Sequence, residues 1–240
     1  MEHIENAESK ERILDASIKL FSEKGFDATR VNEIAEAANV NKALIYYYFK
    51  SKEDILDYLM NSLFNSVTSI AIDFVHENVV QMVQDGRLDI ERDRLHFVDE
   101  EAVEFFMKNA DNYYEKIVDY VIEHRHIMRI LMLESLKNSK HHYDLFRLLD
   151  LTNENENNPI YKTIWDADKD FNYSEDMILF KFFFSLMPCI NFAVYYEDYK
   201  KRSSLSDQEL RRSFLRSLKF IAASMISGSD ILMMDKGTVE

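Results

Sequence analysis

Apolar side chains recur three or four residues apart along most of this chain, which is the spacing of one helix face. The clearest run follows Ser51 and forms one continuous seam: Leu56, Met60, Leu63, Val67, Ile70 and Phe74. Further helices are predicted at about Asp99 to His124, Ile127 to Leu136 and Tyr143 to Leu151, with a short amphipathic piece around Trp165. Alternating patterns are almost absent, and only four glycines and two prolines are present. The pattern predicts an all-α protein.

Two short helices joined by a tight turn are predicted ahead of the long seam. Thr29 can cap the first helix, whose apolar stripe consists of Val31, Ile34, Ala35 and Ala38. Asn39 follows where the chain must turn, and asparagine tolerates the left-handed backbone of a helix end. The first helix should therefore stop at Asn39.

The second short helix is predicted over Lys42 to Tyr48, with Asn41 as its cap. Ile45 and Phe49 would face the first helix, which leaves four residues outside: Lys42, Ala43, Leu44 and Tyr47. In a helix-turn-helix the second helix enters the major groove with its N-terminal residues at base edges. Lysine can donate to guanine there, and a small apolar side chain can touch a thymine methyl.

A third helix start follows directly. Ser51 and Asp54 have the spacing of a capping pair, and Lys50 and Lys52 add positive charge beside the first turn. Because phosphate oxygens bind well at helix N-termini, this end of the unit should hold the DNA backbone.

Four stretches resemble the N-terminal domain of the TetR family of transcriptional regulators. They are Ile-Leu-Asp-Ala-Ser at 13–17, Leu-Phe-Ser-Glu-Lys-Gly-Phe at 20–26, Glu-Ile-Ala at 33–35 and Ile-Tyr-Tyr-Tyr-Phe-Lys-Ser-Lys-Glu at 45–53. The resemblance implies a three-helix helix-turn-helix DNA-binding domain at residues 1–55 and a larger helical ligand-binding and dimerisation domain at residues 56–240.

The same resemblance implies contact residues. Phosphate contacts would fall on Thr29, Tyr48 and Lys52, and base contacts on Lys42, Ala43, Leu44 and Tyr47. Local charge and capping add Arg30, Asn41 and Lys50 to the expected DNA-binding set. The family usually has glycine at the place of Asn39, serine at that of Asn41 and often threonine at that of Leu44, so the family's operator sequences do not transfer to this chain.

The net charge of −14 is opposite to what DNA attracts. Between Thr29 and Lys52, however, four basic residues face two acidic ones, Glu33 and Glu36, for a local charge of +2. At physiological salt the Debye length is about 8 Å, so the sign of the local charge, rather than the net charge of the chain, decides attraction to DNA at short range. The single cysteine, Cys189, and the lack of a leader pattern indicate a cytoplasmic protein.

The stretch from Met177 to Tyr196 is almost continuously apolar and long enough to consider a membrane span. Lys181 within it and Pro188, which breaks helical hydrogen bonds, favour a buried helix of a soluble dimer instead. The final helix is predicted to begin at the capping pair Ser206 and Glu209 and to close at Gly228. We expect a homodimer through the helices near 174–201 and 206–227, and no membrane partner.

Aromatic residues of the middle helices are the candidates for a small-molecule pocket. The expected ligand-binding residues are Phe105, Phe106, Tyr113, Tyr120, Phe146 and Trp165, with Tyr114 and Tyr161 nearby. If Glu104, Asp119 or Glu134 faced that pocket unpaired, a lipophilic cation would be favoured. The expected function is a repressor released from a palindromic operator by a small lipophilic or aromatic effector, and a ligand-dependent activator or corepressor-type regulator remains an alternative.

An enzyme is the remote alternative. The histidine pairs His124 with His126 and His141 with His142 lack the i, i+4 spacing of helical metal ligands, and four glycines leave no phosphate-cradling loop. No catalytic residue, metal or cofactor is therefore expected.

Overall fold

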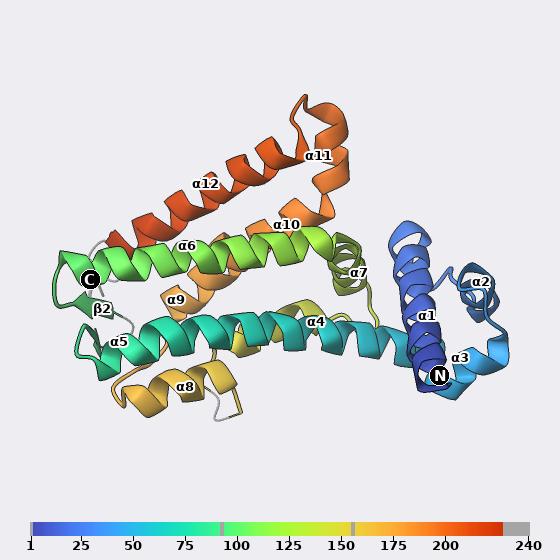
Figure 1. Ribbon diagram of the computed structural model, residues 1–240, viewed down its shortest axis with the longest axis horizontal. Helices are drawn as coiled ribbons and strands as arrows, with labels where there is room; N and C mark the ends of the chain where they lie inside the picture. The colour runs from blue at the N-terminus through green and yellow to red at the C-terminus, as the bar shows by residue number, and fades with distance from the viewer. Residues whose placement is uncertain (1, 92–93, 155–156, 228–240) are drawn as a thin grey trace, which may run out of the picture. The chain divides into compact units, whose positions relative to one another are not determined.

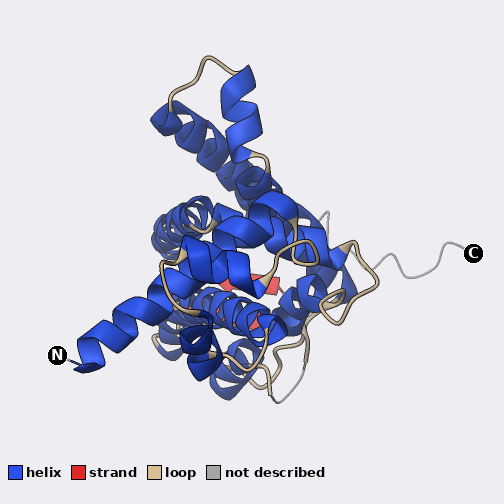
Figure 2. Ribbon diagram, turned by 90° about the vertical axis from the view of Figure 1, so that its right-hand side faces the viewer, coloured by secondary structure: helices blue, strands red, loops and turns tan. Residues whose placement is uncertain are grey.

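The chain is helical almost throughout in its computed structural model, which describes residues 2–91, 94–154 and 157–227. In Figure 2 helices make up most of the described chain, joined by loops, with one small pair of strands. The all-α prediction is thus confirmed. The chain divides into two compact units, one made of residues up to 66 together with 124–145, the other of 67–123 and the residues from 146 onward.

The first unit is built from five helices (Figure 1). They are α1 (Glu2–Lys24), α2 (Val31–Ala37), α3 (Lys42–Tyr48), the first part of α4 (Lys52–Phe74) and α7 (Arg125–Ser135). Because α7 packs against α1, this unit is larger than the segment 1–55 that the sequence suggests.

Polar bonds fasten α7 and the turn after it to the rest of the first unit. The Arg129 guanidinium donates to the carbonyl of Ser22 at 3.0 Å. The Lys137 ammonium donates both to the buried Glu134 carboxylate at 2.6 Å and to Asp27 at 2.9 Å. These partners hold the Lys137 pKa above its ordinary value, although partial burial opposes that rise.

In the second unit, the end of α4 is followed by a π-helical turn and a hairpin, and then by further helices (Figure 1). Its elements are the end of α4, η1 (Val75–Val80), α5 (Gln81–Gln84), β1 (Leu88–Glu91), β2 (Arg94–Phe97), α6 (Glu100–Glu123), most of the 3-10 helix η2 (Asp144–Thr152), α8 (Pro159–Ala167), α9 (Glu175–Phe180), η3 (Lys181–Leu186), α10 (Met187–Val194), α11 (Tyr196–Arg202) and α12 (Asp207–Ser227).

The hairpin is a feature that the sequence analysis missed. β1 and β2 pair antiparallel with Leu88 opposite Phe97 and Ile90 opposite Leu95. Leu88 and Ile90 are buried while the residues between and after them are exposed, so the alternation is present but extends over only four residues. A strand this short gives too weak a periodic signal to stand out beside a charged run.

The helix of the second unit near Tyr143 to Leu151 also differs from expectation, because η2 is a 3-10 helix. The apolar stretch is confirmed as helical, as α9, the π-helix η3 and α10. Within a single chain 28% of the apolar window in Glu175–Val194 is buried, and the predicted burial in a dimer core stays a prediction. By length and composition alone this stretch could cross a membrane.

The last helix begins as predicted. The Glu209 carboxylate accepts from the Ser206 backbone at 2.9 Å and the Glu209 backbone donates to the Ser206 hydroxyl at 3.3 Å, which is a capping box. α12 runs beside α6 (Figure 1), and its Arg211 pairs with Asp119 there. Gly228 lies outside the described residues.

The turn between α2 and α3 adopts the predicted left-handed end. Asn39 has a φ of +53°, and it is the non-glycine residue with positive φ in the described part of the chain. The Val40 backbone donates to the carbonyl of Ala35 at 2.9 Å and that of Asn39 to Glu36 at 3.1 Å. These two bonds form a Schellman closure that fixes the angle between the two helices.

Asn39→Val should lower the free energy of unfolding by about 1–2 kcal/mol, because a β-branched side chain is strained at positive φ. Asn39→Gly should stay within about 0.5 kcal/mol of the parent, because glycine adopts this conformation freely. Urea denaturation measures both, with Asn32→Val on the exposed face of α2 as the control. Equal losses at positions 39 and 32 would contradict this account.

Candidate nucleic-acid interface and ligand cavity

Helix α3 presents a polar and aromatic outer face because its inner face is anchored in the core of the first unit. Ile45 and Phe49 are 1% and 3% exposed, whereas Tyr47 is 73% exposed. Lys42 and Ala43 are exposed as well, and Leu44 is half-buried. The inward and outward faces therefore fall where the spacing predicts, with Leu44 at their border.

The start of α3 is capped by Asn41. Its side-chain oxygen accepts from the Leu44 backbone at 2.8 Å, which confirms the predicted cap. Because this bond holds the amide oxygen of Asn41 inward, the exposed residues of the first turn are Lys42 and Ala43. Tyr46 is a surface residue that the sequence analysis missed: it is 48% exposed, and the Lys42 ammonium lies 5.7 Å from its ring centre.

The predicted cap at Thr29 is wrong. The N-cap of α2 is Arg30, whose backbone N–H donates to the Glu33 carboxylate at 2.7 Å. Thr29 is 1% exposed and its hydroxyl donates to the carbonyl of Gly25 at 2.8 Å, so its side chain lies in the interior rather than on the expected phosphate-binding surface. The Glu33 pKa is held low first by Lys24 and then by the Arg30 backbone.

Lys52 points into the first unit instead of outward. Its ammonium donates to the carbonyls of Phe26 at 2.7 Å and Thr29 at 2.9 Å, and lies 4.2 Å from the centre of the Phe26 ring. We call this arrangement the Lys52 clasp. It joins the first turn of α4 to the loop before α2, a role that sequence spacing gives no sign of.

The remaining expected DNA contacts lie at or near the surface. Arg30 and Lys50 are exposed, and the Lys50 backbone donates to Asp54 at 2.8 Å. Ser51 caps the start of α4 by accepting from the Asp54 backbone at 3.1 Å, as predicted. Tyr48 is half-buried, with its ring 5.0 Å from that of Tyr47.

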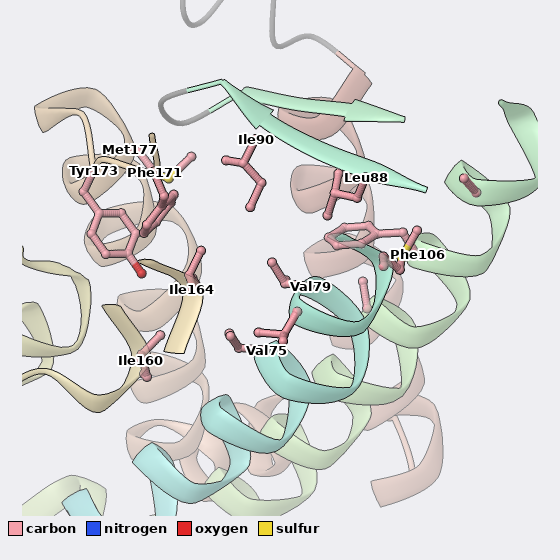
Figure 3. Packing of buried hydrophobic residues seen from close by; sticks show 14 residues of the cluster. Val75, Val79, Leu88, Ile90, Phe106, Ile160, Ile164, Phe171, Tyr173 and Met177 are labelled. Carbon is pink, nitrogen blue, oxygen red and sulfur yellow. The ribbon is translucent and has the colours of Figure 1, made fainter. Parts of the chain in front are cut away.

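An apolar cavity of about 220 Å³ lies inside the second unit. Figure 3 shows the side chains of Val75, Val79, Ile90 and Ile164 pointing toward one another there. These residues come from η1, the hairpin and α8, and other lining residues come from α4, α6 and η3. The cavity is therefore enclosed by segments far apart in the sequence.

Two of the six predicted pocket residues, Phe106 and Tyr113, line this cavity. The other four do not: Phe105, Phe146 and Trp165 are 40% to 44% exposed, and Tyr120 is half-buried elsewhere. Tyr114 also lines it, and its hydroxyl bonds with Ser185. The lining residues that sequence reasoning missed include Phe74, Phe171, Tyr173 and Lys181.

None of the three acids considered as counter-charges for a cation lines the cavity. Glu104 is exposed, and Glu134 is buried in the first unit against Lys137. Asp119 pairs with Arg211 and borders a separate, more polar hollow of about 350 Å³. The structure therefore removes the basis for expecting a lipophilic cation.

The histidines have structural neighbours. His141 is 5% exposed and its Nδ1 lies 2.7 Å from Asp144, while Nδ1 of His142 lies 2.8 Å from the carbonyl of Lys137. His126 approaches the Ser22 hydroxyl at 3.5 Å. Over the described ranges no group of three or more metal-ligating side chains is arranged to hold an ion.

The helix-turn-helix residues match known regulators. Residues 13–59 match the family model of bacterial regulatory proteins, tetR family. The biofilm operon icaADBC negative transcriptional regulator IcaR of Staphylococcus aureus (strain Newman) is 41% identical over 61 residues, which cover 25% of this chain and 33% of that protein. The probable transcriptional regulator YttP of Bacillus subtilis (strain 168) is 33% identical over 85 residues, or 32% of this chain and 41% of YttP.

These matches span about a third to two fifths of the relatives' own length. Among solved structures, the fatty acid degradation regulator FadR from Bacillus halodurans covers 95% of this chain and 96% of its own at 15% identity, with a TM-score of 0.48. A transcriptional regulator from Aquifex aeolicus covers 89% and 99% at 22% identity, with a TM-score of 0.40. The segment 13–59, folded here as a capped helix-turn-helix, is therefore a DNA-binding domain of the type found in the tetR family of bacterial regulatory proteins.

Proposed function

We propose that this protein is a transcriptional repressor that binds a palindromic operator as a homodimer and leaves it when a small apolar effector binds. The observation that carries the proposal is the outer face of α3. Lys42, Ala43 and Tyr47 stand exposed on a helix whose opposite side is buried through Ile45 and Phe49. A helix held this way can enter a major groove with its N-terminal turn at the bases.

The charges around α3 support binding to phosphate. Arg30, Lys42 and Lys50 are exposed, while Lys24 already compensates Glu33. We assign backbone contacts to Arg30, Lys50 and Tyr48, and base contacts to Lys42, Ala43, Leu44 and Tyr47. Thr29 and Lys52, which face inward, are left out of this set, and Asn41 serves as the cap.

The apolar surface of the last helices supports a homodimer. Leu179, Phe183 and Phe184 are each more than half exposed on α9 and η3, and Phe220 is 77% exposed on α12. α12 and η3 contact one another, so these side chains lie on neighbouring helices. A second copy of the chain would remove them from water. It would also supply the second reading head that a palindrome needs, with half-sites about 34–36 Å apart.

The cavity supports the effector. A 220 Å³ space with an almost wholly apolar lining, including Phe106, Tyr113 and Phe171, is suited to a small lipophilic molecule. α4 reaches from the Lys52 clasp to Phe74 in the cavity wall, so a ligand that displaces this wall acts on the helix that also supports the reading head. The same geometry would serve a ligand-dependent activator or a corepressor, and the sign of the effector's influence on operator affinity separates these from a repressor.

Lys42→Ala and Lys50→Ala should weaken DNA binding in different ways. Sites selected from random DNA should show relaxed preference at one position with Lys42→Ala, a loss of about 1–3 kcal/mol of discrimination. Lys50→Ala should weaken all sequences alike and reduce the slope of log affinity against log salt by about 1. Fluorescence anisotropy across a salt series measures both, and the proposal fails at this point if neither variant alters binding.

Lys52→Met should lower the stability of the fold rather than act directly on DNA affinity. Removing the ammonium leaves the carbonyls of Phe26 and Thr29 without these donors, so the free energy of unfolding should fall by about 1–3 kcal/mol. Lys50→Met, on the exposed side of the same turn, should change it by no more than about 0.5 kcal/mol. Chemical denaturation tests this pair. An unchanged stability together with a flatter salt slope for Lys52→Met would instead support a phosphate contact.

Phe220→Glu should weaken the dimer without unfolding the chain, because the ring is 77% exposed in one protomer. A charge placed in a buried interface should raise the dissociation constant about 30-fold or more. Sedimentation equilibrium measures this dissociation constant. Tyr143→Glu is the matched control, because Tyr143 is also an exposed aromatic residue, at 72%, but belongs to the first unit. A dimer equally affected by both changes, or by neither, would place the interface elsewhere.

A further inference from the structure

The cavity in the second unit contains one polar group whose bonding is incomplete. Tyr173 is 5% exposed, and its hydroxyl has no hydrogen-bond partner within the described structure. Its backbone is held, since the N–H donates to the Glu154 carboxylate at 3.1 Å. In Figure 3 the hydroxyl points toward the segment that carries Ile164, another lining residue. A buried phenol without a partner is costly, so a group that bonds with it would gain binding free energy.

A positive charge lies over the ring of this tyrosine. The Lys181 ammonium lies 4.4 Å from the centre of the Tyr173 ring. Among the described residues that line the cavity, Lys181 is the one with a charged side chain. It is the first residue of the π-helix η3, a conformation that often occurs at binding sites. The lining is thus mostly apolar, and Tyr173 and Lys181 contribute a hydroxyl donor and a cation to it.

The charge decides what kind of ligand fits. A cationic ligand would meet the like charge of Lys181 in a mostly apolar surrounding, which is unfavourable. An anionic group could accept a hydrogen bond from Tyr173 and face Lys181. Bonds of this charge-assisted kind are about twice as strong as neutral ones.

The volume limits the size of the ligand. A cavity of 150 Å³ in another protein holds one benzene ring, so about 220 Å³ has room for roughly nine non-hydrogen atoms. Such a ligand is a medium-length alkyl acid or an acid with one aromatic ring.

We propose that the cavity binds a small apolar carboxylic acid, with its hydrocarbon part against Val75, Val79 and Ile164 and its carboxylate at Tyr173 and Lys181. The inference rests on the proposed function, in which this cavity is the effector site, and it names the chemical class of that effector.

Three probes with the same alkyl chain test the class: octanoate, 1-octanol and octylammonium, titrated into the full-length protein by isothermal calorimetry. Octanoate should bind about tenfold more tightly than 1-octanol, and octylammonium should be the weakest. If 1-octanol or octylammonium binds as well as octanoate, the acid class is wrong although the cavity is a ligand site. If none of the three binds, the cavity is not the effector site. Operator binding through α3, measured separately with Lys42→Ala, is independent of either result.

Two variants test the residues. Tyr173→Phe removes only the hydroxyl, so the melting temperature of the free protein should hold or rise while octanoate affinity falls about tenfold. Lys181→Met should reduce octanoate affinity to that of 1-octanol and leave 1-octanol unchanged. Lys169→Met is the matched control, because its ammonium also lies over an aromatic ring, 3.5 Å from the centre of Trp165, but outside the cavity lining.

For Tyr173→Phe, the melting temperature should hold or rise while the octanoate affinity falls, and this combination distinguishes a ligand contact from a structural role. A merely structural tyrosine would lose stability and affinity together, and that outcome would overturn the assignment of its hydroxyl. Equal octanoate affinity in Lys181→Met and Lys169→Met would overturn the assignment of the ammonium.

Discussion

Helix α3 spans seven residues, and an isolated helix of that length does not persist in water. Its shape and direction therefore depend on the burial of Ile45 and Phe49 in the first unit. Two local devices complete the support: the Asn41 cap begins the helix, and the left-handed Asn39 sets its angle to α2. In the proposed DNA complex, Lys42 and Tyr47 would present a fixed pattern to the bases because these apolar contacts hold the opposite face of the helix.

The inward orientation of Lys52 changes the charge of the surface that we propose binds DNA. Taken as sequence, four basic side chains face Glu33 and Glu36. In the structure Lys52 is occupied by the carbonyls of Phe26 and Thr29, but Lys24 from α1 compensates Glu33. The positive charge of Lys52 is turned inward and the negative charge of Glu33 is neutralised, so the surface around α3 keeps its net positive charge. In the proposed DNA complex, attraction for phosphate then depends on the exposed Arg30, Lys42 and Lys50.

The sequence predicted correctly the features that depend on a few neighbouring residues, and it missed those that depend on tertiary packing. The left-handed Asn39, the caps at Asn41 and Ser51 and the capping box at Ser206 each depend on a few neighbouring residues, and the structure has all of them. Thr29 has the right residue type for a cap, yet its hydroxyl bonds backward to Gly25. Which of the adjacent Phe105 and Phe106 faces the cavity depends on how α6 packs against its neighbours in the second unit, such as β2 and α10. Tyr173 and Lys181 are eight residues apart in sequence and meet only because α9 turns Lys181 back over the Tyr173 ring.

The continuity of α4 gives the two units one shared element. Its first residue forms the Lys52 clasp, and its last, Phe74, lines the cavity together with Val67 and Ala71. Between them, Asp57 accepts from Lys140 at 2.6 Å, which binds the turn after α7 to the same helix. A helix fixed at its beginning by hydrogen bonds to two carbonyls and an ion pair cannot shift there without breaking them. Under the proposed function, a ligand at Phe74 would have to bend α4 or supply the free energy to break these bonds. Effector and DNA would then be coupled only to the extent that the effector binds the DNA-bound and DNA-free conformations with different affinity.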